Sequence, residues 1–289
     1  MTHAVSKSAF KVIPKKIPIF SSYLITFYSD LLKRLLSRSM HLSVSCIVPL
    51  LALIFWQYAV DKQWLAIQIL PSPALVWSTL IDLWQSGDLW HHLSISLSRV
   101  LWSLLIGGGG GLVLGIFMGL SRTVKAYVYP TFEVVSQFPV VGWIPLLIIF
   151  VGIDEALKIS AISLAVIVPV TVNTYKGIAN IPLKFLEVAK VYRFSFRQVV
   201  SRVVWAAALP SIFNGFRQGV MQGWLSLVFV ELLASSEGIG YLMVWGRQLL
   251  QLDLVMAGML IIGVVGIALD FTLRGIELYL QRRWLHGAF

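Results

Sequence analysis

The chain has 289 residues, of which 58% are hydrophobic and only 12% are charged, and its formal net charge is +10. A soluble domain typically has about a quarter of its residues charged. So few charges would not cover the surface of a soluble globule, and the composition therefore predicts that most of the chain lies in a lipid bilayer. The cations lie in short segments between apolar runs, which is typical of membrane proteins and argues against a nucleic-acid-binding surface.

Residues 1–41 form a basic segment, with seven Lys or Arg residues against a single acidic residue, Asp30. We expect a cytoplasmic tail rather than a cleavable signal peptide, because no small-residue cleavage site follows a short apolar core. Within Ile19–Leu36, apolar residues recur every four positions, which favours a short amphipathic helix on the membrane surface.

Six apolar runs follow, and each is long enough to cross a hydrocarbon core of about 30 Å at about 1.5 Å per helical residue. The sequence therefore predicts an all-α membrane protein with about six transmembrane helices. The predicted spans are Leu42–Val60, Val100–Leu120, Tyr129–Val151, Leu157–Tyr175, Trp205–Leu233 and Leu254–Leu273. We expect a basic tail at residues 1–41, a first helix with its external loop at 42–94, a core transmembrane region at 95–275 and a C-terminal tail at 276–289.

The distribution of cations predicts how these helices are oriented. With the N-terminus inside the cell, the cytoplasmic segments hold eighteen of the 23 Lys and Arg residues, including six in residues 176–202. The external segments 61–98 and 234–253 clearly contain only Lys62 and Arg247. Because cytoplasmic loops carry an excess of Lys and Arg, we expect both termini to be cytoplasmic.

Glycine recurs every four residues along the second predicted span, at Gly107, Gly111, Gly115 and Gly119, and Gly107–Gly111 is an unbroken run. This spacing clears one helix face for a close neighbour. The close contact between this helix and its neighbour is interpreted either as one that moves during function or as ordinary tight packing. A kink is expected within the glycine run, because consecutive glycines weaken the helix. The run is not a phosphate-binding loop, because no Gly-Lys-Ser/Thr follows it, and the chain contains no Walker A sequence.

The most informative stretch is the segment Leu186–Pro210, whose sequence is LEVAKVYRFSFRQVVSRVVWAAALP. It resembles the cytoplasmic loop of ABC importer permeases, in which Glu-Ala-Ala is followed by a glycine and, later, by an apolar residue and Leu-Pro. Here Glu187–Ala189 matches the start of that pattern, and Arg193 stands where glycine is usual. Ala206 also departs from the pattern, and the helix-breaking proline comes later, at Pro210.

Short motifs elsewhere resemble the aliphatic sulfonate and taurine permeases of the nitrate, sulfonate and taurine group. Together with the loop, they extend the resemblance over about residues 45–285, in the order of the six spans. The motifs are Ile69–Pro73, Leu89–Leu93, Gly152–Glu155, Asn173–Ile178 and Gly238–Leu242.

The resemblance implies a type I ABC importer permease fold in a bacterial inner membrane, with a cytoplasmic coupling helix between the fourth and fifth spans. It implies a homodimer that works with two ATPase subunits and a periplasmic or tethered solute-binding protein. The chain itself is then not an enzyme and holds no cofactor, because the partner ATPase binds ATP and Mg. A sulfonate or taurine is the expected solute; nitrate, bicarbonate, an aromatic acid or a vitamin precursor remain alternatives, as does a secondary carrier, although no internal repeat is visible.

A short helix on the cytoplasmic face can seat in a groove of the ATPase and transmit its closure to the spans. Glu187 is expected at the beginning of this helix, where the helix dipole favours a carboxylate. The apolar members of the segment are expected either to face the ATPase or to pack back on the permease. By the resemblance, the coupling residues are Glu187, Val188, Ala189, Val191, Tyr192, Arg193, Phe194 and Phe196.

Polar residues within the fifth predicted span indicate a path through the membrane. Gln218 and Gln222 share one helix face, and Asn214 and Arg217 lie beside it. Polar groups in a span are costly and usually face the bundle interior or a watery cavity. We therefore expect Asn214, Arg217, Gln218 and Gln222 to line the path of an anion. The open alternative is that Arg217 forms a structural ion pair, with Asp270, Glu133 and Glu231 as the candidate partners.

No metal site or catalytic set is predicted. The adjacent His91 and His92 point to different faces of a helix, which is unsuitable for holding one ion. The five histidines of the chain show no spacing that joins them with carboxylates as metal ligands.

Overall fold

The computed structural model describes residues 47–66 and 69–286, with side chains as far as Leu280. The chain divides into two units, residues 1–62 and 63–289, which are considered separately. In the first unit, a short apolar helix covers Ile47–Asp61. The predicted basic tail, the predicted surface helix at Ile19–Leu36 and the start of the first predicted span lie outside the described residues.

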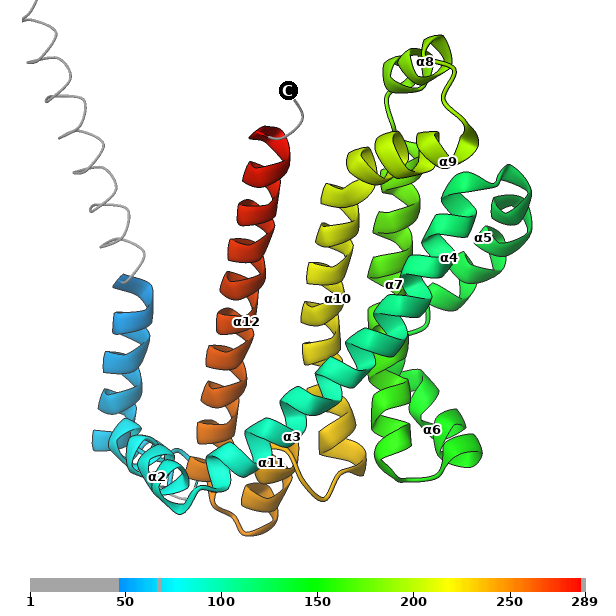
Figure 1. The fold of residues 1–289 in the computed structure, drawn as a ribbon. Helices are drawn as coiled ribbons and strands as arrows, with labels where there is room; N and C mark the ends of the chain where they lie inside the picture. Colours follow the sequence, from blue (N-terminus) through cyan, green and yellow to red (C-terminus); the bar gives the residue numbers. More distant parts are fainter. Residues whose placement is uncertain (1–46, 67–68, 287–289) are drawn as a thin grey trace, which may run out of the picture. The chain divides into compact units, whose positions relative to one another are not determined.

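The second unit is built from helices throughout its described part (Figure 1). Long helices form its body, and short helices lie at their two ends. In chain order they are α2 (Pro73–Ser86), α3 (Asp88–Ser103), η1 (Leu104–Gly108), α4 (Gly109–Leu120), α5 (Arg122–Ser136), α6 (Val140–Val151), α7 (Glu155–Ala179), α8 (Leu183–Val191), α9 (Phe196–Gln198), η2 (Val199–Val204), α10 (Trp205–Ala234), α11 (Ile239–Gln248) and α12 (Leu252–His286).

Within the described residues, four continuous helical stretches are long and apolar enough to cross a membrane, and the bent pair of α5 and α6 adds a fifth. The shorter helix Ile47–Asp61 falls in the first predicted span. The prediction of an all-α protein with about six spans is therefore confirmed. The four continuous stretches are Asp88–Leu120, Glu155–Ala179, Phe196–Ala234 and Leu252–Leu280.

The third predicted span, Tyr129–Val151, is broken into two helices rather than formed by a single one. Helices α5 and α6 are bent by 100° at the break between Ser136 and Val140. The cause is Pro139, which stands in an extended conformation just before α6 and restricts the residue preceding it to non-helical geometry. The second span also starts earlier than predicted, at Asp88 rather than Val100, because α3 runs without interruption into η1.

Helix α7 lies between α4 and α10 and packs against both of them. The glycines of α4 make the first contact possible: a methyl group at Gly115 would lie 2.5 Å from Thr174 Cβ, and one at Gly119 would lie 2.7 Å from Ile178 Cβ. The glycine spacing thus produces tight helix packing, which was one of the two interpretations of the pattern. The π-helical turn η1 covers the first two glycines of the run in which a kink was expected.

Candidate functional site

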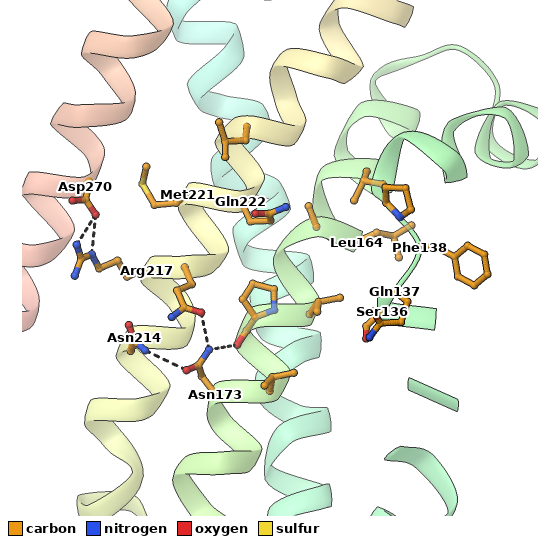
Figure 2. Close-up of a pocket in the computed structure, with 18 residues that line it drawn as sticks. Ser136, Gln137, Phe138, Leu164, Asn173, Asn214, Arg217, Met221, Gln222 and Asp270 are labelled. Atoms are coloured by element: carbon orange, nitrogen blue, oxygen red, sulfur yellow. Dashed lines mark hydrogen bonds and ion pairs between the residues drawn. The ribbon is translucent and has the colours of Figure 1, made fainter. Parts of the chain in front are cut away.

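A pocket of about 800 Å³, lined by both polar and apolar side chains, lies between α7, α10, α12 and the bend between α5 and α6 (Figure 2). All four residues predicted to line a path lie on its wall, and they come from successive turns of α10. Its polar lining residues are Ser136, Gln137, Asn173, Asn214, Arg217, Gln218, Gln222 and Asp270.

An amide chain crosses the wall of the pocket from α7 to α10. Asn214 Nδ2 donates a hydrogen bond of 3.2 Å to Asn173 Oδ1, and Asn173 Nδ2 donates to Gln218 Oε1 at 3.1 Å. The same Asn173 nitrogen also donates to the carbonyl oxygen of Pro169 at 2.8 Å, which fixes the side chain against its own helix. These bonds hold Asn214 and Gln218 in place at the pocket surface (Figure 2).

Arg217 lines the pocket and is also an ion-pair partner. Its Nε and Nη2 donate to Asp270 Oδ1 at 2.9 and 2.7 Å, and its Nη1 donates to Glu277 Oε2 at 3.4 Å. Of the three partners considered from the sequence, the structure thus selects Asp270. The second partner, Glu277, was not foreseen, although it follows Asp270 by two helical turns on the same face of α12.

The break between α5 and α6 was missed as part of this site. Ser136 and Gln137 reach the pocket from the end of α5, and Pro139 and Val140 from the start of α6. A sequence signal was present, since a proline in a predicted helix interior removes a backbone donor and ends or kinks the helix. The bend is what exposes these residues to the pocket.

A second polar cluster, which the sequence reasoning did not predict, is centred on Arg99. Its Nη1 donates to Glu231 Oε1 at 2.7 Å, and its Nη2 and Nε donate to Glu155 at 2.6 and 2.8 Å. Lys158 Nζ donates to Glu155 Oε1 at 2.6 Å. Two cations and two carboxylates therefore balance each other among α3, α7 and α10, as buried charges require.

The same cluster holds the start of α11. The backbone N–H groups of Gly238, Ile239 and Gly240 donate in turn to His92 Nδ1 at 3.0 Å, Ser96 Oγ at 3.0 Å and Glu231 Oε2 at 2.9 Å. The first N–H groups of a helix have no partner within the helix, so side chains from α3 and α10 satisfy them here. This arrangement gives His92 a structural role.

The predicted coupling segment forms α8 and the turn after it, at the end of the second unit away from α2 and α11 (Figure 1). Val188, Val191, Tyr192 and Phe196 are all exposed, and Val191 is 81% accessible. We expected these apolar side chains either to face the ATPase or to pack back on the permease. The second alternative is wrong for these four side chains. Ala189 is buried instead.

The placement of Glu187 at the beginning of the helix is also wrong. Helix α8 begins at Leu183, directly after Pro182, so Glu187 is the fifth of its nine residues. The carboxylate is exposed and lies beyond the first turn, where the helix dipole has little effect on it. Phe194, another residue of the predicted coupling set, packs beside Tyr192 and under the guanidinium of Arg202.

Arg193 adopts a left-handed backbone conformation with φ of 51°. It closes α8, because its N–H donates to the carbonyl of Lys190 at 3.0 Å and the N–H of Phe194 donates to that of Ala189 at 2.9 Å. This pair of bonds is the Schellman motif, whose left-handed position is usually occupied by glycine. Arg193 therefore occupies a position that requires a left-handed backbone conformation, and this is the position at which the loop pattern has glycine.

The sequence of residues 111–286 matches the model of the family described as "Binding-protein-dependent transport system inner membrane component". The chain belongs to this family. It is 36% identical to the putative aliphatic sulfonates transport permease SsuC of Bacillus subtilis over 80% of this chain and 84% of that one. It is also 36% identical to SsuC of Escherichia coli, over 80% and 86%, and 32% identical to the taurine transport permease TauC of that organism, over 84% and 89%.

This binding-protein-dependent inner membrane component shares its fold with a solved importer. A structure of the methionine ABC transporter MetNI matches with a TM-score of 0.50 and 16% identity, over 69% of this chain and 95% of that one. The predicted family and type I permease fold are thus confirmed. The family match includes α7, α8, α10 and α12, and hence the coupling segment and most of the pocket, whereas His92, Ser96 and Arg99 precede it.

Proposed function

We propose that this chain is the transmembrane permease subunit of an ATP-driven importer for a small sulfonate or taurine-like solute. The observation that carries the proposal is the polar pocket between membrane-spanning helices in a member of this transport family. The choice of solute rests on relatives that are named as aliphatic sulfonate and taurine permeases.

In this proposal, two copies of the chain form the pathway together with two ATPase subunits and a periplasmic or tethered solute-binding protein. The ATPase docks on the exposed apolar side chains around α8, which would otherwise contact water at the membrane surface. Both termini lie in the cytoplasm, and ATP and Mg are bound by the ATPase. Closure of the ATPase pair on ATP moves α8, and hydrolysis resets it.

The pocket would conduct an anion through amide donors rather than through a free cation. Arg217 is paired with Asp270 and Glu277, so its charge is not free to hold an anion. The side chains of Gln218 and Gln222 supply neutral N–H donors on the same wall. A modest attraction of this kind favours transport, because a tightly bound anion would be released slowly.

The proposal is tested by uptake into proteoliposomes that contain the permease and its ATPase, with the binding protein added outside. Radiolabelled taurine and ethanesulfonate should accumulate only when ATP is supplied to the ATPase. Nitrate and bicarbonate serve as competing anions. Accumulation of nitrate or bicarbonate but not of sulfonates would contradict the proposed solute, and uptake driven by an ion gradient without ATP would indicate a secondary carrier.

A further inference from the structure

Helix α2 has an exposed tryptophan face whose role the transport function does not explain. Trp77 and Trp84 are 66% and 72% accessible, and Ile81 lies between them and is also exposed. At about 100° per residue, these three side chains share one face of the helix. We propose that α2 lies in the membrane–water interface and inserts Trp77, Ile81 and Trp84 among the lipid headgroups.

The position of α2 is fixed by its C-terminal end and by a contact at its middle. Gly87, with φ of 85°, joins α2 directly to Asp88, the first residue of the spanning stretch Asp88–Leu120. At the middle of α2, Thr79 Oγ1 donates a hydrogen bond of 2.6 Å to Asp253 Oδ2 in the first turn of α12. Both contacts are made in the first turn of a long apolar helix, so α2 lies beside the ends of two candidate membrane-spanning helices, and we infer that this end of the unit faces the bilayer surface.

The surface of α2 divides into three sectors, as a helix at the boundary of protein, lipid and water requires. Val76 and Leu83 are buried against the rest of the unit, and they form the protein-facing sector. The tryptophan face adjoins this sector on one side. A polar exposed sector adjoins it on the other and consists of Ser78, Asp82 and Gln85.

The chemistry of the tryptophan face favours lipid as its occupant. Tryptophan is enriched at membrane–water interfaces, where the ring is partly apolar and its N–H remains near water. Trp90, in the first turn of the stretch that follows, is exposed as well. Helix α2 contains Asp82 but no Lys or Arg, so its attraction to lipid is apolar and independent of anionic headgroups.

The experiment compares two neighbouring positions that lie in different sectors. Cys46, the single cysteine of the chain, is replaced by Ser, and Ile81→Cys or Asp82→Cys is labelled with the environment-sensitive fluorophore NBD. The probe is vesicles of phosphatidylcholine, with and without phosphatidylglycerol. At position 81, emission should shift to shorter wavelength and be quenched by spin-labelled lipid, equally in both kinds of vesicle; at position 82, neither change should occur.

The pair Trp84→Cys and Gln85→Cys repeats the comparison one turn later, so that failure of one variant to fold does not remove the test. Equal exposure of both members of each pair to water would overturn the proposal. So would shielding of position 81 that appears only when the protein-to-lipid ratio is raised or when the solute-binding protein is added, because the occupant would then be a second copy or that protein. These outcomes do not depend on which solute is transported.

Discussion

Arg99 Nη1 lies 2.7 Å from Glu231 Oε1, and the two side chains are only 2% and 1% accessible. The pair joins α3 to α10, and Glu231 extends the connection to α11 through the N–H of Gly240. Removing one member of a buried ion pair leaves the other charge without compensation. This pair therefore determines the arrangement of three helices at the end of the unit opposite to α8.

Glu231→Gln should lower the free energy of unfolding by about 3 kcal/mol, because Glu155 alone then faces both Arg99 and Lys158 and one buried positive charge is left uncompensated, while the shape of the side chain is kept. Thermal unfolding of the purified protein in detergent measures the change. Glu237→Gln is the matched control, since the Glu237 side chain is half exposed and its Oε1 lies 3.9 Å from His91 Nε2. A similar loss in both variants would contradict the role given to Glu231.

Gly115→Ala should destabilise the protein by about 1–3 kcal/mol, because the new methyl group would collide with Thr174 and force α4 away from α7. Gly109→Ala, in the same helix, is the control: a methyl group there meets nothing within 4 Å. That control should be neutral or stabilising by up to about 1 kcal/mol, since alanine favours helix. Unfolding midpoints measured side by side distinguish the two, and equal midpoints would argue against tight packing.

Arg193→Gly should raise the stability of the coupling segment by about 1 kcal/mol, because glycine adopts the left-handed conformation without the steric cost that other residues incur. Hydrogen–deuterium exchange of the α8 amides measures this local effect. Lys190→Gly, within α8, should have the opposite sign and a cost of about 1 kcal/mol. Faster exchange in Arg193→Gly would show that the side chain contributes more than the backbone conformation costs.

Val191→Glu should prevent the ATPase subunit from co-purifying with the permease, because a charge would enter the exposed apolar set around α8. The control is Leu250→Glu, which places the same charge on another exposed apolar residue, after α11. Co-purification should survive in that variant. Loss of the ATPase in both, or in neither, would count against α8 as the docking site.

Gln222→Glu should reduce uptake of ethanesulfonate more strongly than uptake of zwitterionic taurine. A carboxylate about 4 Å from an anion repels it by roughly 4 kcal/mol at an effective dielectric constant of about 20. Gln222→Asn, which keeps an amide at this pocket position, is the control and should retain most of the uptake. An equal reduction for both solutes would indicate that Gln222 lies outside the path of the charged group.

The apolar runs made the membrane-spanning helices predictable, and the spacing of polar residues within α10 predicted which of them share a helix face. Local sequence determines which residues share a helix face, so Asn214, Gln218 and their neighbours were expected close together, and the structure brings them to one pocket. The pairing of distant helices depends on packing that local patterns do not encode. For that reason the choice among the acidic partners of Arg217 stayed open, and the contact of Arg99 with Glu231, more than a hundred residues away, was not foreseen.

The π-helical turn η2, at Val199–Val204, stands between the coupling segment and the pocket-lining part of α10. Such a turn accommodates one more residue than α geometry would, without ending the helix. Deleting one residue inside Val199–Val204 would return the turn to α geometry and leave Asn214 on its present face. Deleting one residue between Trp205 and Asn214 would instead rotate the pocket face by about 100° relative to α8. A change of chain length is therefore tolerable on one side of Trp205 and damaging on the other.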